Sequence, residues 1–163
     1  MAPHRGARSG TSFDGEVRAL YRSLIDAWND RDAAGFATCF AVDGSTVGFD
    51  GSTLEGPIEI ERSLRQIFAD HPTARYVTKV KTLSFPILSV GLLRAVVGMV
   101  PPGENDVNPA VNAIQSLVAI QREGAWRIAL FQNTPAAFHG RPEMVEAHTH
   151  EIREMLGALT RSR

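Results

Sequence analysis

The fold is decided by one stretch, Arg122 to Thr134, which reads REGAWRIALFQNT. A tight turn at Glu123-Gly124 leads into the pattern of a β-strand, in which two sets of side chains alternate. One set is Trp126, Ile128, Leu130 and Gln132, and the other is Arg127, Ala129, Phe131 and Asn133. Both sets contain apolar residues, which is typical of a central strand with both faces covered. We therefore expect the last strand of a sheet here, in a central position.

Each face of this strand ends in an amide side chain beside apolar residues, Gln132 on one face and Asn133 on the other. An amide next to apolar walls is a plausible start for a ligand pocket. Simple alternation places at most one of the two in such a pocket. The competing interpretation is that both amides satisfy backbone groups at the strand end.

Length and composition are those of a globular protein with one domain. The chain has 163 residues and a formal net charge of -1, so nothing indicates binding to nucleic acid or to an acidic membrane. It has one cysteine, Cys39, which we expect to be a buried structural thiol. No run of about 18 apolar residues occurs, so no membrane-spanning helix is predicted. The expected compartment is the cytoplasm.

The first half of the chain predicts three helices and a hairpin. Apolar residues recur at spacings of three and four up to Trp28, which indicates a long amphipathic helix ending near Asn29. Asp32 is placed to cap a short helix over 33–40. A strand over 45–49 then leads into Asp50-Gly51, the pattern of a type I′ hairpin turn. After a return strand over 52–55, Gly56-Pro57 predicts a third helix that ends at His71-Pro72.

The second half predicts an antiparallel meander with strands over 73–85, 87–100, 111–121 and 125–133. Together with the helices this is an α+β layout. Residues 1–11 read as a disordered tail, and residues 135–163 read as an appendage. The appendage contains a helix from Pro142 with one apolar stripe, which either closes the mouth of the domain or packs on a second subunit.

Three pieces of the sequence carry a family resemblance: residues 27–36, the Asp50-Gly51 turn with residues 54–56, and residues 124–134. In this order they resemble the SnoaL-like branch of the nuclear transport factor 2-like superfamily, and especially its SgcJ/EcaC-type group. The resemblance covers residues 12–134. It implies a cone: three N-terminal helices packed on a curved antiparallel sheet, with a cavity between them and an extra C-terminal helix outside. It also implies a homodimer formed through the sheet.

This chain lacks the residues that carry out acid–base chemistry in enzymes of that superfamily. At the tyrosine position of steroid-isomerase-like members this chain has Leu24, and at the sheet-acid position it has Val118. The base position falls at or beside Phe49, and Asp50 is one residue further on, which on a strand would face the other way. Cyclases and dehydratases of the superfamily need a His/Asp pair, but residues 73–100 and 111–134 contain neither residue type.

Metal and cofactor sites are not predicted either. The five histidines include His148 and His150, which are two apart on a helix and so point to different sides. His71 is better placed to interact with a helix end than to catalyse a reaction. No metal-binding motif, glycine-rich nucleotide fingerprint or redox cysteine pair occurs. We therefore expect no metal and no cofactor.

The candidate pocket residues are those whose type suits an apolar site with a few polar groups. They are Trp28, Phe49, Tyr76, Arg94, Gln115, Gln132 and Asn133. Trp28 is either a core anchor or a pocket wall. Arg94 either pairs with an acid across a dimer or binds an anionic or carbonyl group of a ligand.

Two functions remain open from the sequence. The first is a small-molecule-binding protein with an apolar cavity, acting on a hydrophobic polyketide-like or aromatic compound without a recognisable acid/base pair. The second is a non-catalytic dimerisation or interaction module, in which the C-terminal helix recruits a partner. Membership of a fold does not decide between them.

Overall fold

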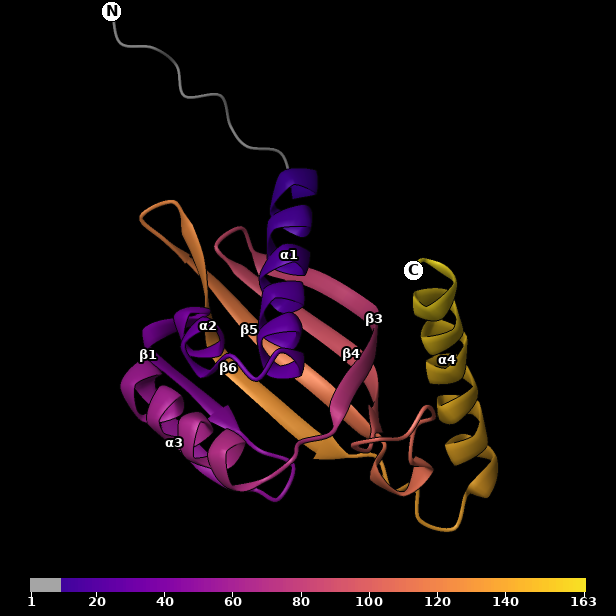
Figure 1. The fold of residues 1–163 in the computed structure, drawn as a ribbon. Helices are drawn as coiled ribbons and strands as arrows, with labels where there is room; N and C mark the ends of the chain where they lie inside the picture. Colours follow the sequence, from indigo (N-terminus) through magenta and orange to yellow (C-terminus); the bar gives the residue numbers. More distant parts are fainter. Residues whose placement is uncertain (1–9) are drawn as a thin grey trace, which may run out of the picture.

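The computed structural model describes residues 10–163, so most of the predicted tail, residues 1–9, lies outside the described part (Figure 1). The elements are α1 (Gly10–Asn29), α2 (Ala33–Thr38), β1 (Phe40–Val47), β2 (Thr53–Glu55), α3 (Gly56–Asp70), β3 (Arg75–Ile87), β4 (Val90–Val100), the short 3₁₀ helix η1 (Pro109–Val111), β5 (Ala113–Arg122), β6 (Ala125–Pro135) and α4 (Pro142–Arg161). The strands form one six-stranded sheet in the order β2-β1-β6-β5-β4-β3. This confirms the α+β prediction and the central position of β6.

The curved sheet wraps around α1, with α2 and α3 beside β1 and α4 beside β3 (Figure 1). The apolar stripe of α1 forms the centre of the main core, where Val17 and Leu24 are fully buried. Neighbouring strands pair antiparallel except β1 and β6, which are parallel. This parallel pair joins β1 and β2, beside α2 and α3, to the antiparallel strands β6, β5, β4 and β3.

A β-bulge interrupts β6. Ala119 of β5 pairs with Ile128, whereas Val118 pairs with Leu130, so Ala129 is an extra residue without a partner in the ladder of β5. A single extra residue reverses the side to which all later side chains point. The strict alternation predicted for this strand is therefore wrong after Ala129.

The bulge places residues of different predicted sets on the same face of β6. Trp126 and Ile128 are buried in the core before the bulge, and Phe131 and Asn133 are buried after it. Gln132 is only half-buried and points to the opposite face. The prediction that Gln132 and Asn133 face opposite ways is confirmed.

The region around Cys39 differs from the prediction. The short helix ends at Thr38, not at residue 40, and β1 begins at Phe40, not at residue 45. The reason is pairing with β6: Phe40 lies opposite Ile128, whose N–H donates to the Cys39 carbonyl over 2.8 Å. Cys39 itself is buried, and burial raises the pKa of its thiol to about 11, as expected of a structural cysteine.

The two tight turns of the sequence have different geometries. Both central residues of the turn between β5 and β6, Glu123 and Gly124, have positive φ, which is the geometry of a type I′ turn. In the turn after β1, Gly51 has a positive φ but Asp50 does not, and the Gly51 N–H donates to the Gly48 carbonyl. The type I′ prediction is therefore wrong for Asp50-Gly51, which belongs to a longer loop ending in a left-handed glycine.

The C-terminal helix α4 packs on the face of the sheet that α1 does not cover. Its Ile152 is fully buried in a second, small core with Val77, Val100 and Val107. Gly98 makes room for it, since a Cβ there would lie 2.6 Å from an Ile152 methyl group. The apolar stripe thus covers the chain's own sheet, whereas the sequence predicted that it closes the mouth of the domain or packs on a second subunit.

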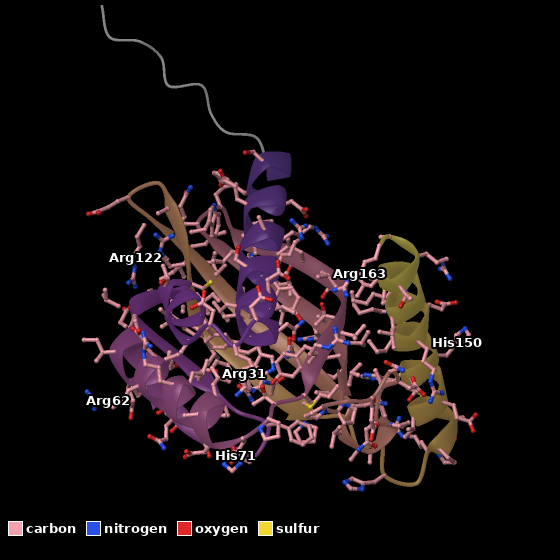
Figure 2. All side chains as sticks on the ribbon, viewed as in Figure 1. Arg31, Arg62, His71, Arg122, His150 and Arg163 are labelled. Atoms are coloured by element: carbon pink, nitrogen blue, oxygen red, sulfur yellow. The ribbon has the colours of Figure 1, made fainter. Side chains whose placement is uncertain are left out.

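Two histidines of α4 behave as their spacing predicts. His148 is buried, with its Nε2 atom 2.9 Å from the Val97 carbonyl oxygen. His150 projects away from the sheet, where its Nε2 lies 3.2 Å from a Glu154 carboxylate oxygen (Figure 2). Within residues 10–163, no helix is both long and apolar enough to cross a membrane.

Candidate functional site

A cavity of about 370 Å³ lies between α1, α2, α3 and the sheet. Its walls are mainly apolar, and aromatic rings from four different elements contribute to them. The lining residues are Trp28, Phe36, Thr46, Gly48, Phe49, Asp50, Ser52, Leu54, Ile67, Thr73, Ala74, Tyr76, Met99, Phe131 and Asn133. Its volume is within the range of small-molecule sites, about 300–1,000 Å³.

The aromatic wall is held in place by hydrogen bonds between α1 and β3. Trp28 stacks on Tyr76 with ring centroids 5.0 Å apart, and its Nε1–H donates to the Ala74 carbonyl over 2.9 Å. The Asn29 side chain bonds both backbone groups of Tyr76, accepting its N–H over 2.8 Å and donating to its carbonyl over 3.0 Å. These contacts pre-form the cavity without a ligand.

Three polar side chains of the cavity are buried, and they come from three strands: Thr46, Tyr76 and Asn133. Burial raises the pKa of Tyr76 to about 12, and a hydrogen bond from the Asn133 side chain to the phenol acts against this rise. Its phenol is therefore neutral at physiological pH. The Asn133 Oδ1 atom is buried and has no hydrogen-bond partner in the described structure. An orphaned acceptor costs about 1–3 kcal/mol, so a donor from a ligand or from water is expected there.

A second polar pair lies deeper in the core. The Tyr21 hydroxyl donates to Gln115 Oε1 over 2.6 Å, and burial raises the pKa of this phenol above its usual value. Gln115 is fully buried and lies directly opposite Asn133 on the neighbouring strand. Its Nε2 atom is unpaired in the described structure. One unpaired atom of each amide, the Nε2 donor of Gln115 and the Oδ1 acceptor of Asn133, thus belongs to a directly opposed residue pair.

Of the predicted pocket residues, the structure brings four together at the cavity: Trp28, Phe49, Tyr76 and Asn133. That a ligand contacts them stays a prediction. Gln115 lies on the inner face of β5 but is not among the lining residues. Arg94 and Gln132 are on the opposite face of the sheet, because each sits one residue out of phase with its inward-pointing neighbours.

Sequence reasoning missed several lining residues for identifiable reasons. The sequence placed Phe131 in a different set from Trp126 and Ile128, because the bulge at Ala129 was not recognised. Asp50 was set aside by strand alternation, which does not apply because Asp50 lies in a loop. Leu54, Ile67 and other apolar residues join the wall through packing, for which no local signal exists. The remaining ones are Phe36, Thr46, Gly48, Ser52, Thr73, Ala74 and Met99.

The lining contains two titratable side chains, Asp50 and Tyr76. Asp50 is its one carboxylate, and hydrogen bonds from Ser52 lower the pKa of that group. No histidine lies beside it, so the lining contains no imidazole–carboxylate pair. Among residues 10–163, no group of three or more His, Cys, Asp or Glu side chains is arranged to hold a metal ion.

A more open groove of about 530 Å³ lies next to the cavity, beyond Trp28 and the loop between α3 and β3. Arg31 lines this groove and has a positive φ. Its guanidinium donates to the Phe68 and His71 carbonyls and to the Thr73 hydroxyl. These bonds tie the end of α1 to the loop after α3. We therefore regard the less open and more apolar cavity, and not this groove, as the candidate site.

The structure resembles several solved proteins. A domain of unknown function with a cystatin-like fold from Nostoc punctiforme is 22% identical, with a TM-score of 0.75 over 93% of this chain and 98% of that chain. A nuclear transport factor 2-like protein of unknown function from Shewanella oneidensis is 11% identical, with a TM-score of 0.61 over 74% of this chain and 98% of that chain. A ketosteroid isomerase-like protein from Erwinia carotovora is 14% identical, with a TM-score of 0.59 over 75% and 95%.

Sequence comparisons add nothing to these likenesses: no protein-family model and no curated protein matches the chain. Identities of 11 to 22% establish the fold and not the activity. The chain has the fold of the nuclear transport factor 2-like proteins, and its cavity lies between the helices and the sheet.

Proposed function

We propose that the protein binds a small hydrophobic compound, aromatic or polyketide-like, as a SnoaL-like member of the nuclear transport factor 2-like superfamily. The observation that carries this proposal is the pre-formed apolar cavity with the unpaired, buried oxygen of Asn133 in its wall. Apolar walls with a few converging polar groups are the usual composition of a ligand site. The sequence motifs over residues 27–36 and 124–134 support the SnoaL-like assignment.

We favour binding over isomerase-type catalysis because of the residues at the positions that carry the catalytic tyrosine and the sheet acid in steroid-isomerase-like members. Leu24 is a fully buried core residue of α1, and Val118 points to the outer face of the sheet. Neither can supply the donors of an oxyanion hole inside the cavity. The neutral phenol of Tyr76 and the Asn133 amide are suited to orienting a ligand by hydrogen bonds.

A cavity-filling variant tests the proposal. Thr46 lines the cavity, whereas Val47 next to it on β1 does not, so T46F and V47F form a matched pair. We expect compounds from a panel of aromatic polyketides to raise the melting temperature of the wild type and of V47F by several degrees. T46F should lose this shift, because its ring occupies the ligand volume. If no compound shifts the wild type, or if T46F responds like V47F, the cavity is not the ligand site.

A homodimer formed through the outer face of the sheet is a second proposal, supported by apolar residues there. Leu92, Val118 and Leu130 lie in register on β4, β5 and β6. Leu92 is 41% exposed, and the other two are half-buried in the single chain. By contrast, the stripe of α4 is largely used within the chain, which argues against this helix as the recruiting element.

An arginine in the middle of this face is expected to break such a dimer. V118R should halve the mass measured by light scattering, from twice 17.7 kDa to the monomer value. The matched control is V42R, because Val42 is 86% exposed and lies on β1, outside the three strands that carry Leu92, Val118 and Leu130. A wild type that is already monomeric at micromolar concentrations would contradict this proposal.

A further inference from the structure

The lining of the cavity carries one sign of charge. Among its residues Asp50 is the one charged side chain, and no lysine, arginine or histidine is present. Asp50 is exposed at the loop after β1, and its Oδ1 accepts the Ser52 N–H over 2.9 Å. That bond holds the carboxylate at the mouth and favours its ionised form. A bound anion would thus meet a negative charge and no compensating positive one.

The unpaired polar group of the wall also demands a donor. Asn133 is 7% exposed, lines the cavity, and presents an Oδ1 atom without a partner. A carboxylate or ether of a ligand cannot satisfy an oxygen acceptor, whereas an N–H or O–H group can. The other two buried polar residues, Thr46 and Tyr76, carry hydroxyls that accept as well as donate. The polar lining therefore offers one unpaired acceptor, Asn133 Oδ1, to a donor group of the ligand.

Aromatic rings supply the third feature. Trp28, Phe36, Phe49, Tyr76 and Phe131 all line the cavity. The face of an aromatic ring attracts a cation, with estimates from about 0.5 kcal/mol at exposed sites to about 2 kcal/mol where the cation is desolvated. The same rings stack on an aromatic ligand. An ammonium ion attached to an aromatic ring would use both properties.

One cationic side chain, Arg31, bonds a lining residue of the cavity: its guanidinium donates to the Thr73 hydroxyl over 2.9 Å. Arg31 lines the neighbouring groove and not the cavity. Its guanidinium is solvent-exposed and already bonded to two backbone carbonyls. Water and salt screen both exposed charges, Arg31 and Asp50, but Asp50 lines the cavity and Arg31 does not, so a bound cation lies beside the carboxylate.

We propose that the cavity selects an aryl-alkyl ammonium ion over neutral and anionic compounds of the same shape. The selectivity comes from the Asp50 carboxylate at the mouth, the five aromatic side chains of the wall, and the unpaired acceptor of Asn133. This inference rests on the proposed binding function and names the chemical class of the ligand. The remaining lining is apolar and fits the ring.

Three probes with one skeleton and three charges test the inference. They are 2-phenylethylamine, a cation at neutral pH, 2-phenylethanol, which is neutral, and phenylacetate, an anion. Calorimetric titration of the full chain should give the order amine, alcohol, acid, with the amine about tenfold tighter than the alcohol. Higher salt should narrow this difference, because it screens Asp50.

Two asparagine variants separate the role of Asp50 from that of net charge. D50N keeps an oxygen for the Ser52 N–H and removes the charge, so amine affinity should fall about tenfold towards that of the alcohol. D43N changes the net charge equally, but Asp43 lies outside the cavity in an exposed pair with Arg122, and amine affinity should stay unchanged. Equal losses in both variants would overturn the assignment to Asp50.

The outcomes separate this inference from the proposed function. If the alcohol or the acid binds as tightly as the amine, and T46F abolishes that binding, the charge selectivity is refuted and the binding function stands. If none of the three binds while a polyketide of the panel does, the ligand class is refuted and the binding function again stands. If neither set binds, both proposals fail.

Discussion

Replacement of Phe131 by alanine is expected to lower the free energy of unfolding by about 3–5 kcal/mol, the usual cost of removing a buried phenylalanine. Phe131 is 2% exposed and packs edge-on against Phe36 with ring centroids 6.2 Å apart. It also forms part of the cavity wall, so the site cannot collapse fully around the deletion. Urea unfolding followed by tryptophan fluorescence measures the change.

The matched control is the next residue, Gln132, whose side chain lies half-buried on the opposite face. Q132A should change the free energy of unfolding by less than about 1 kcal/mol, as is usual for substitutions outside the core. This pair tests the bulge at Ala129 directly. If Q132A were the more destabilising variant, the alternation from Trp126 would continue without interruption and the inward face of β6 would be misassigned.

The bulge explains where prediction from the sequence stops. Local patterns were sufficient for the amphipathic stripe of α1, for the Glu123-Gly124 turn and for the central place of β6. They were insufficient at Ala129, because a bulge depends on the register of the neighbouring strand and not on the strand's own sequence. Because this one extra residue was missed, Phe131 and Asn133 were assigned to the face opposite Trp126 and Ile128. In the structure all four side chains lie on the same buried face.

The candidate site was predictable to a similar degree. Trp28 and Tyr76 were recognised as aromatic residues beside polar groups, and the structure stacks them in one wall. Arg94 was included for its apolar sequence neighbours, but such neighbours occur on both faces of a central strand and do not tell which side is hollow. Asp50 was excluded by a rule for strands that does not govern a loop. Which loop closes over a cavity depends on tertiary packing alone.

The second large effect is expected in alkaline solution, because both tyrosines of the chain, Tyr21 and Tyr76, are buried. In the unfolded chain both phenols ionise near pH 10, whereas burial raises the pKa of Tyr76 to about 12 and that of Tyr21 further. Above pH 10 the unfolded state therefore loses protons that the folded state keeps. Stability present below pH 10 must fall as the pH rises towards 12, by roughly 1.4 kcal/mol per pH unit for each tyrosine.

Phenolate absorbance in the near ultraviolet measures this effect without interference from an exposed tyrosine, since the chain has only these two. The native protein should show almost no phenolate at pH 10.5, and both groups should appear together, and abruptly, when the fold is lost. In Y76F the contribution of the phenols to the loss of stability with pH should be halved, because Tyr21 is the one remaining tyrosine. Cys39 adds a decline of the same sign, since burial also raises the pKa of its thiol, but a thiolate does not contribute to the phenolate band. A gradual titration near pH 10 in the folded protein that is absent from Y76F would show that Tyr76 is open to water, and the buried aromatic wall of the cavity would have to be abandoned.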